Sequence, residues 1–162
     1  MTKPNYTFKM PIGDWSSDGH GQCEYFKIQS DVPLEEVREA HFLIHEKTGI
    51  DISKICSEYQ EPYLFFNDVV QLINLGFDTS LILDFDAELL EKAREKNDPE
   101  IYEGNTDGVD AETVAHIWLF LLNQVNQDMN LKIIPDEEEM LVFYGFDKKG
   151  RHIESPGYGC FY

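Results

Sequence analysis

Four side chains near the amino terminus have the types and spacing of a metal site. His20 and Cys23 are separated by two residues, and His41 and His45 by three. Imidazole and thiolate groups are the ligands that Zn²⁺ prefers, and structural zinc sites use four of them. Two histidines at positions i and i+4 of a helix lie on one face. The spacing therefore predicts a candidate zinc site, which would be catalytic if one position stayed open for water.

The same four residues also have plainer interpretations. The gap between Cys23 and His41 is longer than in common zinc units, and His41 falls within an apolar stripe. A buried histidine that hydrogen-bonds a backbone group explains His41 equally well. His20 would then be a loop residue, Cys23 a core residue of a strand and His45 a partly exposed helix residue.

Calcium is a second metal candidate and is less expected than zinc. Residues 14–19 read Asp-Trp-Ser-Ser-Asp-Gly, which matches the first half of a calcium-binding loop. The glutamate that should close the loop is absent, because its twelfth position is Tyr25. Residues 103–108 repeat the pattern more loosely. Since Asp, Asn, Ser and Gly also build ordinary turns, both segments fit turns as well, and no cofactor is required by the sequence.

The distribution of charge is the other feature that could define a function. The 162 residues include 31 acidic and 13 basic side chains, for a net charge of −18. The segment 84–112 holds 11 of these acids and only 3 bases, so they cannot all pair within the chain. We therefore expect an acidic surface that binds a basic protein and accelerates the encounter. The candidate contact residues are Asp84, Asp86, Glu88, Glu91, Glu95 and Glu103.

Composition excludes several other classes of protein. The 11 Phe, 8 Tyr and 2 Trp residues argue against a disordered polyanion. Binding to nucleic acid or to an anionic membrane is not expected, because both require Lys and Arg. The longest apolar run, 114–122, is far shorter than the roughly 20 residues that span a bilayer. We see no secretory signal, and three widely spaced cysteines fit a reducing compartment, so a cytoplasmic location is expected.

Hydrophobic periodicity predicts the elements that must position these residues. Alternating patterns predict strands near 6–10 and 23–28, and a helical repeat predicts one helix over 33–48, with Asp31 as its N-cap. Further helices are expected from about 67 to 75, closed by Gly76, and from Asp84 or Asp86 to 97. The longest helix should begin at Asp110 and carry Trp118 in its apolar face. It is the candidate central helix of the core.

Strands at both ends of the chain and helices between them define the expected fold. A terminal hairpin is predicted from the run 140–144 and a strand at His152–Ile153. We therefore expect one α+β domain over residues 1–162. Its antiparallel sheet would be built from the N-terminal and C-terminal hairpins and packed against about four helices.

Two functions from different classes follow from these features. The first is a small acidic cytosolic binding protein, for example an inhibitor or immunity-type protein that docks on a basic protein surface. The alternative is a metal-binding domain or metal-dependent hydrolase that uses the His/Cys cluster. A third interpretation gives the acidic residues no partner, because acidity alone keeps many proteins soluble.

Overall fold

The main sheet of the protein has three antiparallel strands. In the computed structural model, which describes residues 6–14, 22–52, 64–82, 85–104, 111–134, 145–146 and 152–153, their order is β1-β2-β3. A separate two-stranded sheet joins β4 and β5. The combination of antiparallel sheet and helices confirms the α+β fold. The strands are β1 (Tyr6–Asp14), β2 (Gln22–Ser30), β3 (Lys132–Ile134), β4 (Gly145–Phe146) and β5 (His152–Ile153).

The helices of the described chain all lie between β2 and β3 in the sequence. Six are α-helical, compared with the four or so expected, and two are short 3₁₀ helices. The α-helices are α1 (Leu34–Phe42), α2 (Ile44–Thr48), α4 (Phe66–Leu75), α5 (Ala87–Lys96), α6 (Pro99–Glu103) and α7 (Ala111–Val125). The 3₁₀ helices are η1 (Thr79–Leu81) and η2 (Gln127–Met129).

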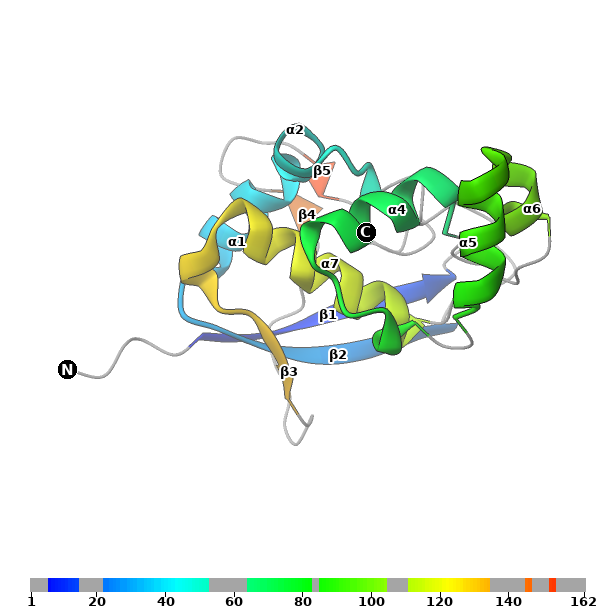
Figure 1. Ribbon diagram of the computed structural model, residues 1–162. Helices are drawn as coiled ribbons and strands as arrows, with labels where there is room; N and C mark the ends of the chain where they lie inside the picture. The colour runs from blue at the N-terminus through cyan, green and yellow to red at the C-terminus, as the bar shows by residue number, and fades with distance from the viewer. Residues whose placement is uncertain are drawn as a thin grey trace.

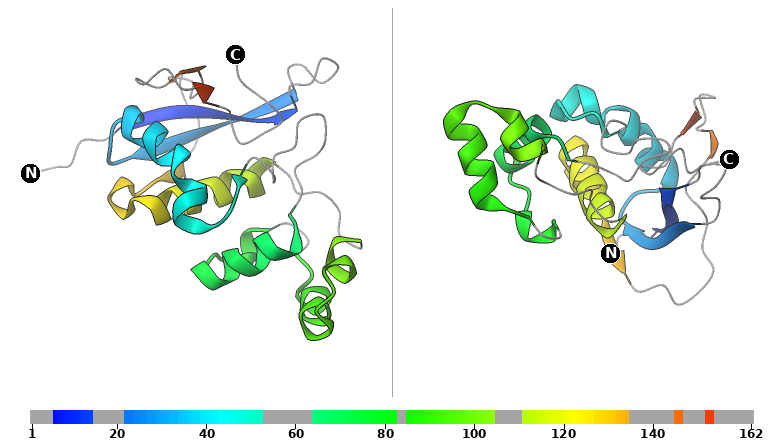
Figure 2. Two further views of the ribbon diagram at one scale, coloured as in Figure 1. Left: turned by 90° about the horizontal axis from the view of Figure 1, so that it is seen from above. Right: turned by 90° about the vertical axis from the view of Figure 1, so that its right-hand side faces the viewer.

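These elements form layers, with α7 in the middle (Figure 1). The three-stranded sheet lies on one side of α7, and α4, α5 and α6 lie on the other side (Figure 2). α1 and α2 also pack against α7. A helix covered from several directions must be apolar around most of its circumference, and α7 meets this requirement. Ile117, Trp118 and Leu121 of α7 are all completely buried.

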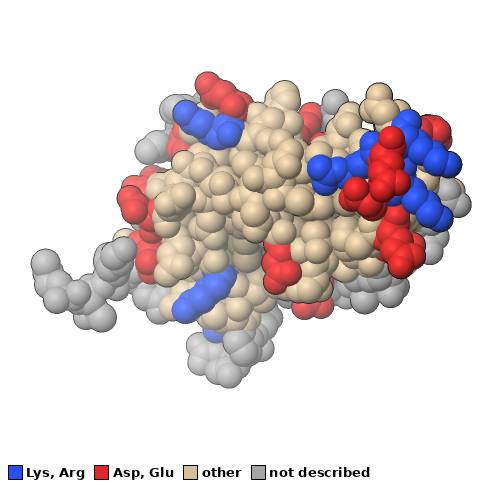
Figure 3. Space-filling model, viewed as in Figure 1, with Lys and Arg blue, Asp and Glu red and all other residues tan. Residues whose placement is uncertain are grey.

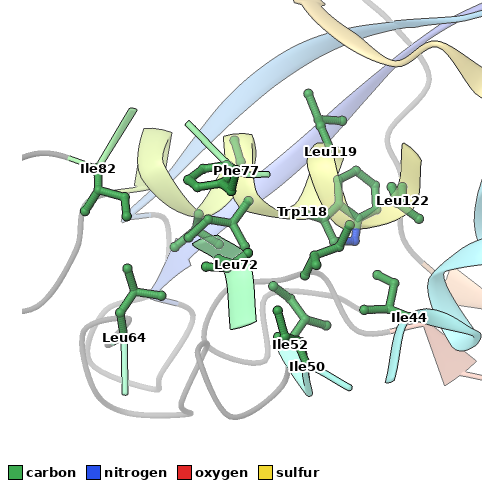
Figure 4. Close-up of a cluster of buried hydrophobic side chains, with 14 of the residues drawn as sticks. Ile44, Ile50, Ile52, Leu64, Leu72, Phe77, Ile82, Trp118, Leu119 and Leu122 are labelled. Carbon is green, nitrogen blue, oxygen red and sulfur yellow. The ribbon is translucent and has the colours of Figure 1, made fainter. Parts of the chain in front are cut away.

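The buried side chains form one cluster that joins the layers (Figure 4). Phe8 and Ile28 are partners across β1 and β2, and both are fully buried, as the two-residue period of a strand requires. On the other side of α7, the rings of Phe77 and Phe120 meet edge to face with centroids 5.1 Å apart. Among the described residues, Trp118 is the largest fully buried side chain, which confirms its predicted place in the core.

The single helix expected over 33–48 is in fact two helices. α1 ends at Phe42, and Leu43 (φ −98°, ψ −2°) separates it from α2. α1 begins after Pro33 instead of being capped by Asp31, whose carboxylate accepts a hydrogen bond from the Asn130 side chain at 3.3 Å. The predicted end is confirmed, because Gly49 (φ 78°) takes the left-handed conformation that stops α2.

The pairing of the N-terminal and C-terminal strands also differs from expectation. The C-terminal strands do not extend the N-terminal hairpin in the described residues, and β3 is the third strand of the main sheet. β3 is only three residues long, which is too short for a clear alternating pattern. β5 confirms the strand predicted at His152–Ile153. The predicted strand over 140–144 and the proposed cap Asp110 lie outside the described residues.

Candidate functional site

α5 is the helix at the centre of the predicted acidic surface. Its N-terminus is fixed by Asp86, whose carboxylate accepts a hydrogen bond from the backbone N–H of Leu89 at 3.0 Å. This confirms the expectation that Asp84 or Asp86 caps the helix. Leu90 and Ala93 are buried, and α5 packs against α6. The orientation of α5 on the protein is therefore set by its cap and by one apolar face.

Three glutamates lie on the outward side of α5. Glu88, Glu91 and Glu95 are all exposed, and their spacing of three and four residues places them in one stripe along the helix. We call these residues the acidic stripe. At 100° per residue, the stripe is opposite the face that carries the buried Leu90 and Ala93. No other described residue forms an ion pair with its carboxylates, so they are available to a partner.

Basic side chains flank the acidic stripe. Lys92, Arg94 and Lys96 of α5 are also exposed, and Figure 3 shows Lys and Arg beside Asp and Glu over this end of the molecule. Helical spacing places the two lysines on one side of the stripe and Arg94 on the other. Residues 86–103 still contain seven acids against three bases. The surface is therefore acidic in net charge but carries both signs.

Two of the predicted contact residues have structural partners within the chain. Glu103, at the end of α6, accepts a hydrogen bond from the backbone N–H of Phe66 at 3.0 Å, so it caps α4 from another helix. Asp86 caps α5 in the usual local way. Asp84 lies outside the described residues. The acidic stripe is therefore the part of the predicted set that has no structural role in the described fold.

His41, a predicted metal ligand, instead contacts the core. The indole N–H of Trp118 donates a hydrogen bond to its Nδ1 at 2.8 Å. Because Nδ1 accepts, the neutral ring holds its proton on Nε2. Burial lowers the pKa of His41 to about 4, so the ring is neutral at pH 7. His41 therefore has a hydrogen-bond partner inside the protein, as its plainer interpretation expected. That partner is the indole of Trp118 and not the backbone group that was expected.

The other predicted metal ligands are not brought together by the described part of the fold. His45 is exposed on α2, beyond the break that separates α2 from α1. His20, the side chain of Cys23 and the calcium-like residues 15–19 and 105–108 lie outside the described residues. Within the described ranges, no three His, Cys, Asp or Glu side chains are grouped so that they could hold a metal ion. The zinc and calcium sites stay predictions.

One pocket was not foreseen from the sequence. It has a volume of about 330 Å³ and lies where α1 meets the carboxy-terminal end of α7. Four of its residues follow the i, i+3, i+4, i+7 spacing of residues on one helix face. This spacing is the part of the pocket that the sequence could have indicated. The α7 side of the pocket comes from a distant part of the sequence. The lining residues are Glu36, Glu39, Ala40, Leu43, Val125 and Asn126.

Comparisons with known proteins do not assign a function to this geometry. No family model, no curated protein and no solved structure matches the chain. Among the helices that the structure describes, none has the length and apolar character needed to cross a membrane, and α7, with 15 residues, is the longest.

Proposed function

We propose that this protein is a small acidic binding protein of the cytosol that docks α5 on a basic protein surface. The observation that carries the proposal is the acidic stripe. Its three exposed carboxylates lie opposite the buried face of a helix whose N-terminus is fixed by the Asp86 cap. An inhibitor or immunity-type protein that covers the basic groove of an enzyme is one form of this function.

The spacing of the stripe favours joint action of its charges. Glu88 and Glu95 are seven residues apart, which corresponds to about 10 Å along a helix axis. The length of the stripe is close to the Debye length of roughly 8 Å at physiological salt. A cation of the partner that approaches the middle of the stripe is therefore attracted by all three carboxylates. A single exposed ion pair contributes only about 1 kcal/mol or less, and several acting together can steer association.

The flanking bases add specificity to this attraction. A partner that places cations opposite the acidic stripe must avoid further cations opposite Lys92, Arg94 and Lys96, because like charges in contact oppose binding. The surface therefore favours a partner with a narrow basic ridge or groove edge over one with a uniformly basic face.

The test compares two triple variants with equal changes in charge. The first replaces the stripe (Glu88→Gln, Glu91→Gln, Glu95→Gln). The matched control replaces three exposed acids on other elements (Glu35→Gln, Glu46→Gln, Asp128→Asn). Wild type and both variants serve as baits for affinity capture, and the association rate of any captured protein is then measured at increasing salt concentration.

The proposal expects a basic partner that binds wild type and the control but associates more slowly with the stripe variant. The difference should be greatest at low salt, where screening is weakest. An acidic partner, or an equal loss of rate in both variants, would show that the position of the stripe does not matter. With an acidic partner the acidity would serve solubility alone, and with equal losses it would act only through the net charge of the protein.

A further inference from the structure

α4 presents a row of uncharged amide side chains on its outward side. Val69 and Leu72 are completely buried, so they mark the face of α4 that is turned to the core. At 100° per residue, Asn67, Gln71 and Asn74 lie on the opposite face. Asn67 and Asn74 are exposed, and Gln71 is partly buried. We call these three residues the amide row.

The surroundings of the amide row carry little charge, although the chain is strongly acidic. The segment 65–81 contains no Lys or Arg, and its two acids are Asp68 and Asp78. Asp68 lies about 90° around the helix from the row. Asp78 follows α4 and accepts a hydrogen bond from the backbone N–H of Ser80 at 3.0 Å. Figure 3 shows a broad area of largely uncharged surface in the middle of this face, where α4 lies, beside the charges of α5.

The amide row has hydrogen-bonding capacity that the described part of the chain does not use. Gln71 donates from Nε2 to the backbone carbonyl of Thr48 at 2.8 Å, which holds its side chain in place and leaves Oε1 as an acceptor. Within the described ranges, no residue bonds to the side-chain amide of Asn67 or Asn74. Because every carboxamide both donates and accepts, a row of amides can pair with an identical row.

We propose that the amide row is a contact surface between two copies of this chain, with their α4 helices antiparallel about a two-fold axis. Near such an axis each residue meets its own kind, so a carboxylate there would meet a carboxylate. Amides bond to each other without this repulsion, and an Asn between paired helices fixes their register. The axis lies near Gln71, and Asn67 of each copy is opposite Asn74 of the other.

Apolar side chains near the ends of α4 add contact area. Phe65, directly before the helix, and Leu81 in η1 are each 39% exposed. In the antiparallel arrangement Phe65 of one copy lies opposite Gly76 of the other, by the same register that pairs Asn67 with Asn74. Gly76 has open space where a side chain would stand. The ring of Phe65 can therefore pack on the end of the opposite helix.

The antiparallel arrangement also keeps the two acidic stripes apart. Glu103 of α6 bonds to the backbone N–H of Phe66, so α6 and its neighbour α5 lie at the N-terminal end of α4. The α5 helices of the two copies are then at opposite ends of the dimer. Each copy still carries a net charge of −18, so long-range repulsion opposes association, and added salt should relieve it.

The experiment measures the mass of the full-length protein by sedimentation equilibrium at several protein and salt concentrations. The mass should rise with protein concentration from 18.8 kDa toward twice this value, and dimerisation should strengthen as salt is added. The salt dependence proposed for the acidic stripe has the opposite sign, because attraction to a basic partner weakens with salt. The stripe variant should dimerise at least as well as wild type, so the two proposals fail independently.

Paired variants test the position and the register of the contact. Asn67→Asp with Asn74→Asp brings four carboxylates together in the dimer and should weaken association by about tenfold or more. The matched control, Asn97→Asp with Gln127→Glu, adds the same charge at exposed positions on other elements and should weaken it much less. Asn67→Lys with Asn74→Asp places opposite charges across the axis and should dimerise about as well as wild type. Unfolding midpoints confirm that each variant folds.

Three results would overturn the inference. A mass of 18.8 kDa at every protein and salt concentration would exclude a second copy as the occupant of this face. Equal weakening by the double aspartate variant and its matched control would exclude α4 as the contact surface. Loss of the dimer in Asn67→Lys with Asn74→Asp, as complete as in the double aspartate variant, would exclude the antiparallel register.

Discussion

α7 and α5 show opposite ways of using a helix. α7 is covered by the sheet on one side and by other helices elsewhere, and most of its side chains are buried. α5 buries one narrow face and presents charges over the rest. If α5 binds a partner as proposed, stability and recognition are carried by different helices, so changes in α7 should act on unfolding and changes in α5 on association.

Trp118→Ala should have the largest effect on stability. It removes a completely buried indole and leaves Nδ1 of His41 without its donor. Truncating a large buried aromatic side chain typically costs about 3–5 kcal/mol. Chemical denaturation measures the loss, and Trp118→Phe should lose less because it keeps most of the volume. An unchanged unfolding midpoint for Trp118→Ala would contradict the central place of α7.

His41 should make the fold sensitive to acid. Its pKa is lowered from 6.5 to about 4 by burial, so between these pH values the unfolded chain binds a proton that the folded protein does not. Stability should therefore fall as the pH decreases from about 6.5 to 4, by at most about 3.4 kcal/mol, and this loss should stop below pH 4.

The control for this pH effect is a second histidine. His41→Gln should remove this part of the pH dependence, whereas the exposed His45→Gln should leave it in place. Free energies of unfolding measured across this range provide the test. Identical pH profiles for the wild type and His41→Gln would exclude a role for this imidazole.

Asp86→Ala should have a moderate effect on stability, and this effect should be confined to α5. It removes the hydrogen bond to the Leu89 N–H, and loss of such a cap typically costs about 1 kcal/mol. Asp86→Asn should keep most of the stability, because an amide oxygen can also accept this bond. Amide exchange should show the loss concentrated in the first turn of α5, and an even loss across α7 would contradict the separation.

The stripe variant should have the smallest effect on stability. Glu88, Glu91 and Glu95 are exposed and make no ion pair with a described residue, so replacing them with Gln should change the free energy of unfolding by a few tenths of a kcal/mol. A slight gain is expected because like charges are removed. A loss larger than that of Asp86→Ala would mean that the stripe holds the fold together.

Local signals predicted the parts of the fold that depend on local interactions. The start of α5 followed from Asp86, the end of α4 from Gly76 and the burial of Trp118 from its apolar surroundings. The break at Leu43 had no marker, because leucine favours helix and neither proline nor glycine is present there. β3 was missed because its position depends on pairing with β2, about a hundred residues earlier.

The candidate sites were harder to predict for the same reason. The sequence identified the acidic stripe as part of an acidic segment but not that Glu103 turns back to cap α4. His41 fitted a metal pattern, yet its partner Trp118 is 77 residues away. The pocket joins α1 to Val125 at the end of α7, and no periodicity within a single helix reveals that meeting.

The central position of α7 has a consequence for synthesis of the chain. Both the sheet and the α4–α6 layer bury their apolar sides against a helix that begins only at Ala111. At about 5–20 residues per second, the earlier elements are made several seconds before the surface that covers them. Phe8, Ile28 and Leu72, which are fully buried in the folded protein, therefore stay in the nascent chain without the helix that packs against this core. Burial of this core is therefore coupled to the synthesis of α7, and until α7 is made these apolar surfaces are exposed to aggregation.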